Sequence, residues 1–492
     1  MRYKHIIIPC ILLLGSFILR LLLISKGPFS IDCFDLALKA EKTYSSGQLQ
    51  YMFGPGYPFA IILGAMFIWL FNAFNISSPI FAVNMMSVVT GSLAVFFFYR
   101  ISESITDQKS AIFGTVLFSL NPIVLGYSVY GTSNAPTLLW LCVSVYFLII
   151  SRENKDSLKN LLLSAVFFGL LGGTRLQDMI FLSIPIASLL FISKKAYRIR
   201  RIFVFFLTAV SVSILFYLPF VLTDMRIEYL SQLTRFRALN VPTYSWDFTK
   251  ESFFKIHIYL LNALLPIGLI TSLYGLFILV RNKNPFTLFL LLWFFIPFEI
   301  TIRFATTYSR YLLIPIVPLS IAAGACLSYL FSKGRIFKMA SILILCRIFY
   351  FSFLPMYKLL DFRHHRSVII EYCKWINGIT EKNAFMISCD DRSFINHYGD
   401  REIISRPMDS FHISREQLEE FKTRLDEKLE EGYPVYITAI GLYDYSPNGE
   451  FTSFMELHYR IKYAGKGLYE DWHSGAEDRR IFYNSLYKVT KK

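Results

Sequence analysis

Long apolar runs are the feature that most constrains what this chain can fold into. Residues 1–359 alternate between short polar loops and about eleven mostly apolar stretches. A helix of about 20 such residues crosses the hydrocarbon core of a bilayer. The sequence therefore predicts an α-helical polytopic membrane domain. The predicted spans are about 6–25, 80–99, 110–127, 135–151, 160–174, 177–192, 203–222, 257–280, 286–302, 310–331 and 338–356.

The distribution of basic residues predicts the orientation. Lysine and arginine are dense in the loops 193–201, 281–284 and 332–338, and such loops face the cytoplasm. This favours a cytoplasmic N-terminus in a cell or inner membrane. It also favours a non-spanning position for the apolar segment 57–74, although hydropathy alone leaves open whether that segment spans. The outward-facing parts are then the loops 26–56, 128–134, 223–256 and 303–309, together with the C-terminal part.

The positive net charge of +15 does not indicate a nucleic-acid partner. Residues 1–359 hold 31 Lys and Arg against 13 Asp and Glu, whereas residues 360–492 hold 19 against 22. The excess therefore lies in membrane loops and not on a soluble basic face.

The composition becomes that of a soluble protein near Asp361. We expect two domains, a membrane domain over 1–359 and a small extracytoplasmic α/β domain over 360–492. In the second, 415–432 reads as an amphipathic helix with Leu418, Phe421, Leu425 and Leu429 on one face. The predicted strands are 384–389, 435–440, 459–465 and 481–489.

Acidic residues are scarce in the membrane part, yet Asp32, Asp35 and Glu41 cluster in the first outer loop. Charged groups are costly at membrane depth and tend to mark functional cavities. Asp32 and Asp35 would share a face of a helical turn, so that one could act as general base while the other orients a substrate or a cation. The alternative is a solvated loop in which Ser30 or Asp32 caps a helix at about 34–45.

Three further polar positions interrupt apolar segments. Arg20 either extends to the membrane interface or lines the same cavity as Asp32. Asn134 either binds a polar substrate or caps a helix. Arg175 and Asp178, at i and i+3, favour a structural ion pair, although Arg175 is also a candidate for substrate binding.

The remaining candidates lie in or near outer loops. Arginine suits bidentate binding of phosphate, and four arginines are candidates for it; the alternative for each is an anchor at the membrane interface. The motif GPGYP (54–58) predicts a rigid turn, and its tyrosine is a further candidate for substrate binding. No histidine or cysteine spacing matches a zinc site, so no cofactor follows; a divalent cation is compatible with the acidic loop, but no pattern supports one. These loop candidates are Tyr57, Arg235, Arg237, Arg303 and Arg310.

The order of these features resembles the membrane-embedded GT-C glycosyltransferases, in particular the relatives of protein O-mannosyltransferases and of the aminoarabinose transferase. The resemblance covers roughly residues 6–330. It rests on Arg20 in the first span, the acidic loop that begins at Asp32, the GPGYP turn, and the segments 81–102, 118–149, 169–186 and 309–325.

This resemblance implies an inverting transferase that takes a sugar from a polyprenyl-phosphate carrier on the outer face and passes it to a lipid, glycan or protein acceptor. It implies Asp32 as the base or acceptor-orienting group. The chain departs from the family where Cys33 follows Asp32 in place of an acid, so Asp35 could take the second role. Asn134 stands where the family often has a carboxylate. A transporter or flippase of lipid-linked sugars, and a membrane scaffold, are the rival interpretations.

Overall fold

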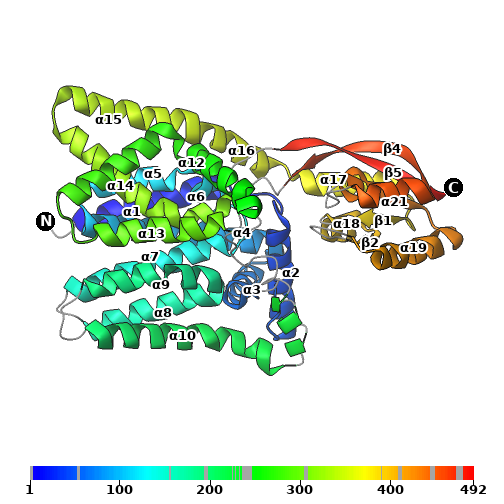
Figure 1. Ribbon diagram of the computed structural model, residues 1–492, viewed down its shortest axis with the longest axis horizontal. Coiled ribbons are helices and arrows are strands. Elements are labelled where there is room, and N and C mark those ends of the chain that lie inside the picture. The colour runs from blue at the N-terminus through cyan, green and yellow to red at the C-terminus, as the bar shows by residue number, and fades with distance from the viewer. Residues whose placement is uncertain are drawn as a thin grey trace. The chain divides into compact units, whose positions relative to one another are not determined.

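The computed structural model describes residues 4–52, 56–153, 157–192, 198–223, 225–227, 229–231, 233–234, 246–303, 308–388, 391–407, 413–443, 449–471 and 480–492 (Figure 1). The chain forms two compact units. Unit 1 contains the residues up to Lys26 and those from Asp35 to His365, and unit 2 contains Gly27–Phe34 and most of the chain from Arg366 onward.

Unit 1 is helical, and α14 is its central helix. α14 packs against α5, α7, α12, α13 and α15, and most of its residues are buried. Small residues allow this close packing: a Cβ on Gly324 would lie 2.3 Å from the carbonyl oxygen of Ser110. The helices are α1 (Lys4–Leu22), α2 (Ile31–Ser46), α3 (Pro58–Asn72), α4 (Pro79–Ile105), α5 (Gln108–Ser119), α6 (Pro122–Gly126), α7 (Asn134–Glu153), α8 (Leu158–Thr174), α9 (Leu176–Phe191), α10 (Arg198–Leu222), α12 (Trp246–Arg281), α13 (Thr287–Ile302), η2 (Ser309–Leu312), α14 (Leu313–Ser332), α15 (Arg335–Ile348), η3 (Phe349–Phe353) and α16 (Leu354–His365).

Within the described residues, six helices are long and apolar enough to cross a membrane, and five further apolar helices are shorter. The predicted number of about eleven spans stays a prediction, as does the non-spanning position of α3. Two predicted spans are wrong as continuous helices: 257–280, which is interrupted at Leu265, and 110–127. The segment 110–127 breaks at Asn121, whose side chain accepts from the backbone N–H groups of Ile123 and Val124 and so caps α6.

α12 is kinked inside unit 1. Leu265 has φ 58° and ψ 159°, and Pro266 follows it, so the helical hydrogen-bond ladder is interrupted there. The Asn121 side chain donates to the carbonyl oxygen of Ala263 at 2.9 Å and so satisfies a group near the break. One asparagine therefore caps α6 and supports the kink of α12.

The segment that the sequence predicted as the first outer loop contains a helix that begins earlier than expected. α2 runs over Ile31–Ser46, so its first four residues belong to unit 2 and the rest to unit 1. The backbone N–H of Cys33 donates to the Ser30 hydroxyl at 3.3 Å. Ser30 is thus a cap, as the alternative interpretation expected. Asp32 and Asp35 lie in the first turns of α2 and share a face, and both are half-buried.

Unit 2 is a five-stranded sheet of order β2-β1-β3-β5-β4, in which β1 pairs in parallel with β2 and β3, and β5 pairs antiparallel with β3 and β4. The predicted helix is confirmed as α19, whose Phe421 and Leu425 are buried in the core that α21 completes. The elements are α17 (Val368–Ile379), β1 (Phe385–Ser388), α18 (Arg392–Gly399), β2 (Glu402–Ser405), α19 (Arg415–Glu430), β3 (Val435–Thr438), α20 (Ala439–Tyr443), α21 (Glu450–His458), β4 (Tyr459–Glu470) and β5 (Ile481–Lys491).

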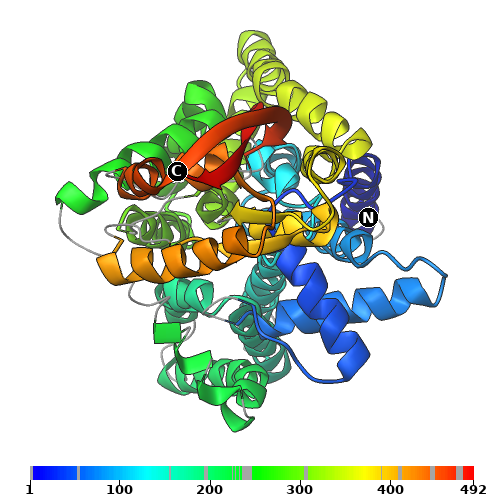
Figure 2. The same cartoon turned by 90° about the vertical axis from the view of Figure 1, so that its right-hand side faces the viewer.

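The four predicted strands are present as β1, β3, β4 and β5, but β4 is longer than expected. The predicted strand ended at Gly465, whereas β4 continues to Glu470. A Cβ on Gly467 would lie 2.4 Å from the Trp375 ring, so glycine here permits a close approach of α17. The short β2 was missed. Figure 2 shows β4 and β5, in red, as a long curved ribbon.

Candidate active site in the membrane unit

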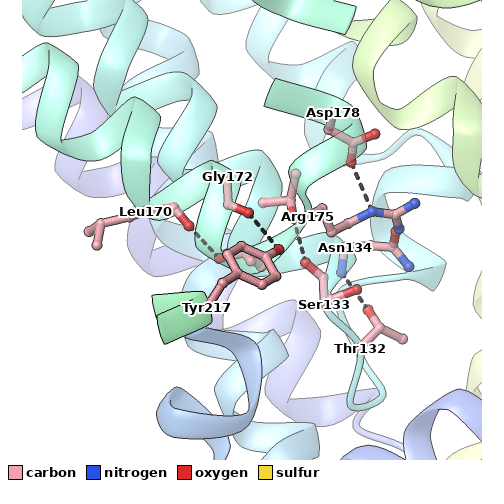
Figure 3. Close-up of polar contacts among 10 residues, drawn as sticks. Thr132, Ser133, Asn134, Leu170, Gly172, Arg175, Asp178 and Tyr217 are labelled. Carbon is pink, nitrogen blue, oxygen red and sulfur yellow. Dashed lines mark hydrogen bonds and ion pairs between the residues drawn. The ribbon is translucent and has the colours of Figure 1, made fainter. Parts of the chain in front are cut away.

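The candidate site is built on the junction between α8 and α9. The two predicted spans meet at Arg175, which is extended (φ −152°, ψ 95°) and ends one helix while preceding the next. The last turn of α8 is held by side chains: Tyr217 donates to the Gly172 carbonyl at 3.0 Å, and Thr174 donates to the Leu170 carbonyl at 2.8 Å (Figure 3). These contacts fix the backbone from which Arg175 projects.

Arg175 is buried and contacts two polar side chains. Its Nε lies 2.9 Å from Oδ2 of Asp178, which confirms the predicted ion pair. Its guanidinium also donates to the side-chain oxygen of Asn134, at the start of α7 (Figure 3). Asn134 is the first residue of α7, and its side-chain oxygen bonds to a residue 41 positions away and so connects α7 to the α8–α9 junction.

A second arginine borders the same place. Arg310 in η2 stacks on Tyr308, with its guanidinium carbon 4.5 Å from the ring centre, and it interacts electrostatically with Arg175 and Asp178. A cavity of about 20 Å³ lies between Asn134, Arg175, Asp178 and Arg310, enough for about one water-sized group. Two guanidinium groups and one carboxylate give the cavity an excess of positive charge.

Tyr57 also lies at this site, with the three other predicted substrate-binding residues Asn134, Arg175 and Arg310. The guanidinium carbon of Arg175 lies 6.0 Å from the centre of its ring. Tyr57 has φ 47° and ψ 45°, a left-handed conformation that is costly for a bulky residue and is often found at functional sites. Gly56 before it has φ 89°, and a Cβ there would lie 2.7 Å from Phe220.

The other candidates lie elsewhere. Arg20 is fully buried, so the prediction that it extends to the interface is wrong; it donates to the hydroxyls of Ser16 and Ser119. Arg303 pairs with Glu299 on α13 and borders a separate groove against α9. Whether Asp32 and Asp35 act in catalysis stays a prediction. Arg235 and Arg237 lie outside the described residues.

Tyr57 was predicted at this site, but the tyrosines around Arg310 were not. Tyr308 and Tyr311 flank Arg310, and the Tyr127 hydroxyl lies 3.1 Å from the Ser309 hydroxyl, which holds η2 to the end of α6. The signal was present in the segment TYSRYL, where tyrosines surround the arginine at a membrane boundary. Within the part of the chain that the structure describes, no group of three His, Cys, Asp or Glu residues could hold a metal ion.

A much larger cavity lies in unit 1 beside the kink of α12. It has a volume of about 520 Å³, and its walls come from α5, α12, α14, α15 and η3. Most of the lining is apolar and none of it is charged; its polar side chains are those of Asn121, Ser272, Ser320, Tyr350 and Ser352. Ser320 lies six residues beyond Ile314, which borders the small cavity, so about 9 Å of α14 separates the two.

Comparison with known proteins agrees with this architecture. Residues 58–222 match the family described as dolichyl-phosphate-mannose-protein mannosyltransferase. The fold is similar to that of ArnT from Cupriavidus metallidurans bound to undecaprenyl phosphate, with a TM-score of 0.61, 11% identity, and coverage of 99% of this chain and 98% of that one. No curated protein sequence matches the chain.

An archaeal enzyme gives a second likeness. The fold is similar to that of the Archaeoglobus fulgidus oligosaccharyltransferase tethered with an acceptor peptide, with a TM-score of 0.62, 14% identity, and coverage of 98% of this chain and 74% of that one. The resemblance seen in the sequence is thereby confirmed: the chain has the fold of the GT-C membrane glycosyltransferases, and over residues 58–222 it carries the sequence pattern of their mannosyltransferase family.

Proposed function

We propose that the protein is an integral-membrane glycosyltransferase that moves a sugar from a polyprenyl-phosphate carrier to an acceptor hydroxyl on the outer face of the membrane. The observation that supports this most is the meeting of Asn134, Arg175 and Arg310 at one buried cavity with excess positive charge. A phosphate that leaves with growing negative charge needs such a site.

In this proposal Arg175 and Arg310 bind the carrier phosphate. Arginine presents planar sets of N–H donors that match phosphate oxygens. Asp178 and Asn134 each hold the Arg175 guanidinium, so its orientation is fixed before the donor binds. The cavity admits one phosphate oxygen, and the rest of the headgroup lies outside it.

The large apolar cavity is suited to part of the isoprenoid tail. Ligand cavities commonly measure about 300–1,000 Å³ and are mostly apolar. This cavity borders α14, the same helix that borders the small charged cavity. An uncharged lining favours a hydrocarbon chain over a polar ligand. A transporter would instead need polar groups along a path for the sugar.

The reaction is a single displacement. The acceptor oxygen forms a bond to the anomeric carbon while the bond from that carbon to the phosphate oxygen breaks, and the acceptor proton passes to a carboxylate of the first outer loop. We assign that role first to Asp32 and alternatively to Asp35. A positioned general base contributes about 10²–10⁴-fold to the rate.

The test uses purified protein and a panel of radiolabelled polyprenyl-phosphate sugars. A glycosyltransferase releases free polyprenyl phosphate, a flippase moves the intact lipid without release, and a scaffold does neither. We expect Asp32→Asn to abolish release while expression is retained. Activity in Asp32→Asn with loss in Asp35→Asn would assign the base to Asp35, and full activity in both would refute the first-loop mechanism.

A further inference from the structure

The ribbon formed by β4 and β5 in unit 2 has a distinctive exposed face. Cross-strand register puts Tyr463 opposite Tyr487 and Leu468 opposite Tyr483, and Lys466 lies between these pairs, opposite Ser485. Side chains in register alternate between faces, so these residues share one face of the ribbon. Tyr463 is 61% exposed and Tyr483 is 63% exposed, so two large rings present themselves to solvent.

The rings and the lysine form one surface, which we call the tyrosine face (Tyr443, Tyr463, Lys466, Tyr483 and Tyr487). The Lys466 ammonium lies 4.9 Å from the centre of the Tyr483 ring, and the rings of Tyr463 and Tyr487 are 6.1 Å apart. Tyr443, at the end of α20, is 55% exposed; partial burial and the neighbouring Tyr487 raise the pKa of its phenol.

The charge of the ribbon is opposite to that of the rest of its domain. Residues 459–471 and 480–492 contain seven Lys and Arg and two Asp and Glu, a net charge of +5. The other residues of 360–492 contain twelve basic and twenty acidic side chains, a net charge of −8. Two of the seven, Lys488 and Lys491, pair with Glu381 and Glu430 outside the ribbon, and Lys466 is the basic residue of the tyrosine face itself. The ribbon as a whole still attracts an anionic partner, and the acidic surface around it repels one.

We propose that the tyrosine face binds an anionic saccharide, a glycan that carries carboxylate or phosphate groups. Sugar C–H groups carry partial positive charge and pack against the negative face of an aromatic ring, as cations do. The phenol hydroxyls offer hydrogen bonds to sugar hydroxyls, and Lys466 offers its charge to the acidic group.

Two other partners fit the face less well. A surface that inserts into a bilayer presents Trp, Phe or Leu beyond its basic residues, whereas here the exposed rings end in hydroxyls and Leu468 is half-buried. A stable protein interface buries about 800 Å² on each partner, which a face only two strands wide does not offer.

Binding is tested on the full chain in nanodiscs of phosphatidylcholine, without donor lipid, so that the result is independent of the transfer proposed above. The probes are a sulfated dextran oligosaccharide, the neutral dextran of the same length, and phosphatidylglycerol vesicles. We expect the sulfated probe to bind more tightly than the neutral one. Lys466→Gln and Tyr483→Ala should each weaken it about fivefold, as the loss of an exposed cation–π contact and its charge implies.

Lys462→Gln is the matched control, because Lys462 lies on the same strand and carries the same charge but is opposite Lys488, whose ammonium contacts Glu381 on the other face. We expect it to change affinity less than twofold. Equal losses in Lys462→Gln and Lys466→Gln would overturn the proposal, as would equal affinity for neutral dextran. Binding of the vesicles with the same dependence on Lys466 and Tyr483 would assign the face to a membrane instead.

Discussion

Arg175 in unit 1 and Arg401 in unit 2 are both buried, but they use their guanidinium groups differently. Arg401 donates to the backbone carbonyls of Asn377, Thr380 and Asp400 at 2.8–3.0 Å. These carbonyls lie at the ends of α17 and α18, where helices leave acceptors without intrahelical partners. Arg401 also donates to the side-chain oxygens of Thr380 and Asn377, so its acceptors all belong to residues at these two helix ends.

Arg175 instead contacts the side chains of Asp178 and Asn134 and the ring of Tyr57, and it borders a cavity together with Arg310. The two guanidinium groups repel each other at one buried place, and this repulsion lowers stability. Stability alone therefore does not explain why both are there. The contrast separates an arginine that holds two helix ends in place from one that we propose is positioned for a ligand. The same substitution at both positions should therefore have opposite consequences.

The largest effect is expected from Arg175→Lys. Lysine keeps the charge but loses the planar set of donors that two side chains orient, so phosphate stabilisation in the transition state should fall. We expect release of polyprenyl phosphate to drop about 10²–10³-fold, as for loss of one preorganised donor. The melting temperature in detergent should change little.

If Arg175→Lys lowered stability as much as activity, the proposed difference between the two arginines would be wrong, because Arg175 would then be structural like Arg401. Activity should be expressed per folded molecule, as judged by size-exclusion chromatography. Leu176→Ala is a suitable control, since Leu176 is the next residue but its side chain is exposed.

The second-largest effect is expected from Arg401→Lys, which should lower the stability of unit 2 and leave activity unchanged. An ammonium cannot reach all the carbonyls at the ends of α17 and α18, and each buried acceptor left without a donor costs about 1–3 kcal/mol. We expect the free energy of unfolding of unit 2 to fall by about 2–3 kcal/mol. Faster amide hydrogen exchange in residues 368–379 and 392–399 would report it.

Transfer by the folded fraction of Arg401→Lys should equal that of the unaltered protein. A loss of transfer without faster exchange would contradict the structural role. Lys374→Arg offers a control on α17, because Lys374 is exposed and its replacement keeps the charge.

The residues of the candidate site could be predicted from the sequence better than the contacts between them. The segment GGTRLQDM marked the break between α8 and α9, and its i, i+3 spacing predicted the ion pair of Arg175 and Asp178. The contact of Arg175 with Asn134 spans 41 positions, and the proximity of Arg310 depends on the packing of α14. No local pattern encodes such contacts, because they follow from how the helices pack.

The same limit explains the errors in the fold. Asn121 and Ala263 are 142 positions apart, so the hydrogen bond that supports the kink of α12 left no local signal. Two positions were left open for Arg20, the membrane interface and the cavity beside Asp32, because hydropathy describes position along a helix and not which face is buried. Its fully buried guanidinium reflects the packing of α1 against neighbouring segments, which the apolar pattern does not encode.

The smallest of the expected effects is that of Asn134→Ala. This change removes one of the two side chains that orient Arg175 and leaves Asp178 in place, so the guanidinium keeps its charge partner but loses part of its orientation. A hydrogen bond to a charged group contributes about 1.5–3 kcal/mol, and the remaining ion pair compensates for part of this. We expect transfer to fall about tenfold, which corresponds to about 1.4 kcal/mol. A comparison of kcat and KM sharpens the assignment: loss of orientation in the transition state lowers kcat, whereas loss of uniform donor binding raises KM alone. Unchanged kinetics in Asn134→Ala would mean that Asp178 alone positions Arg175.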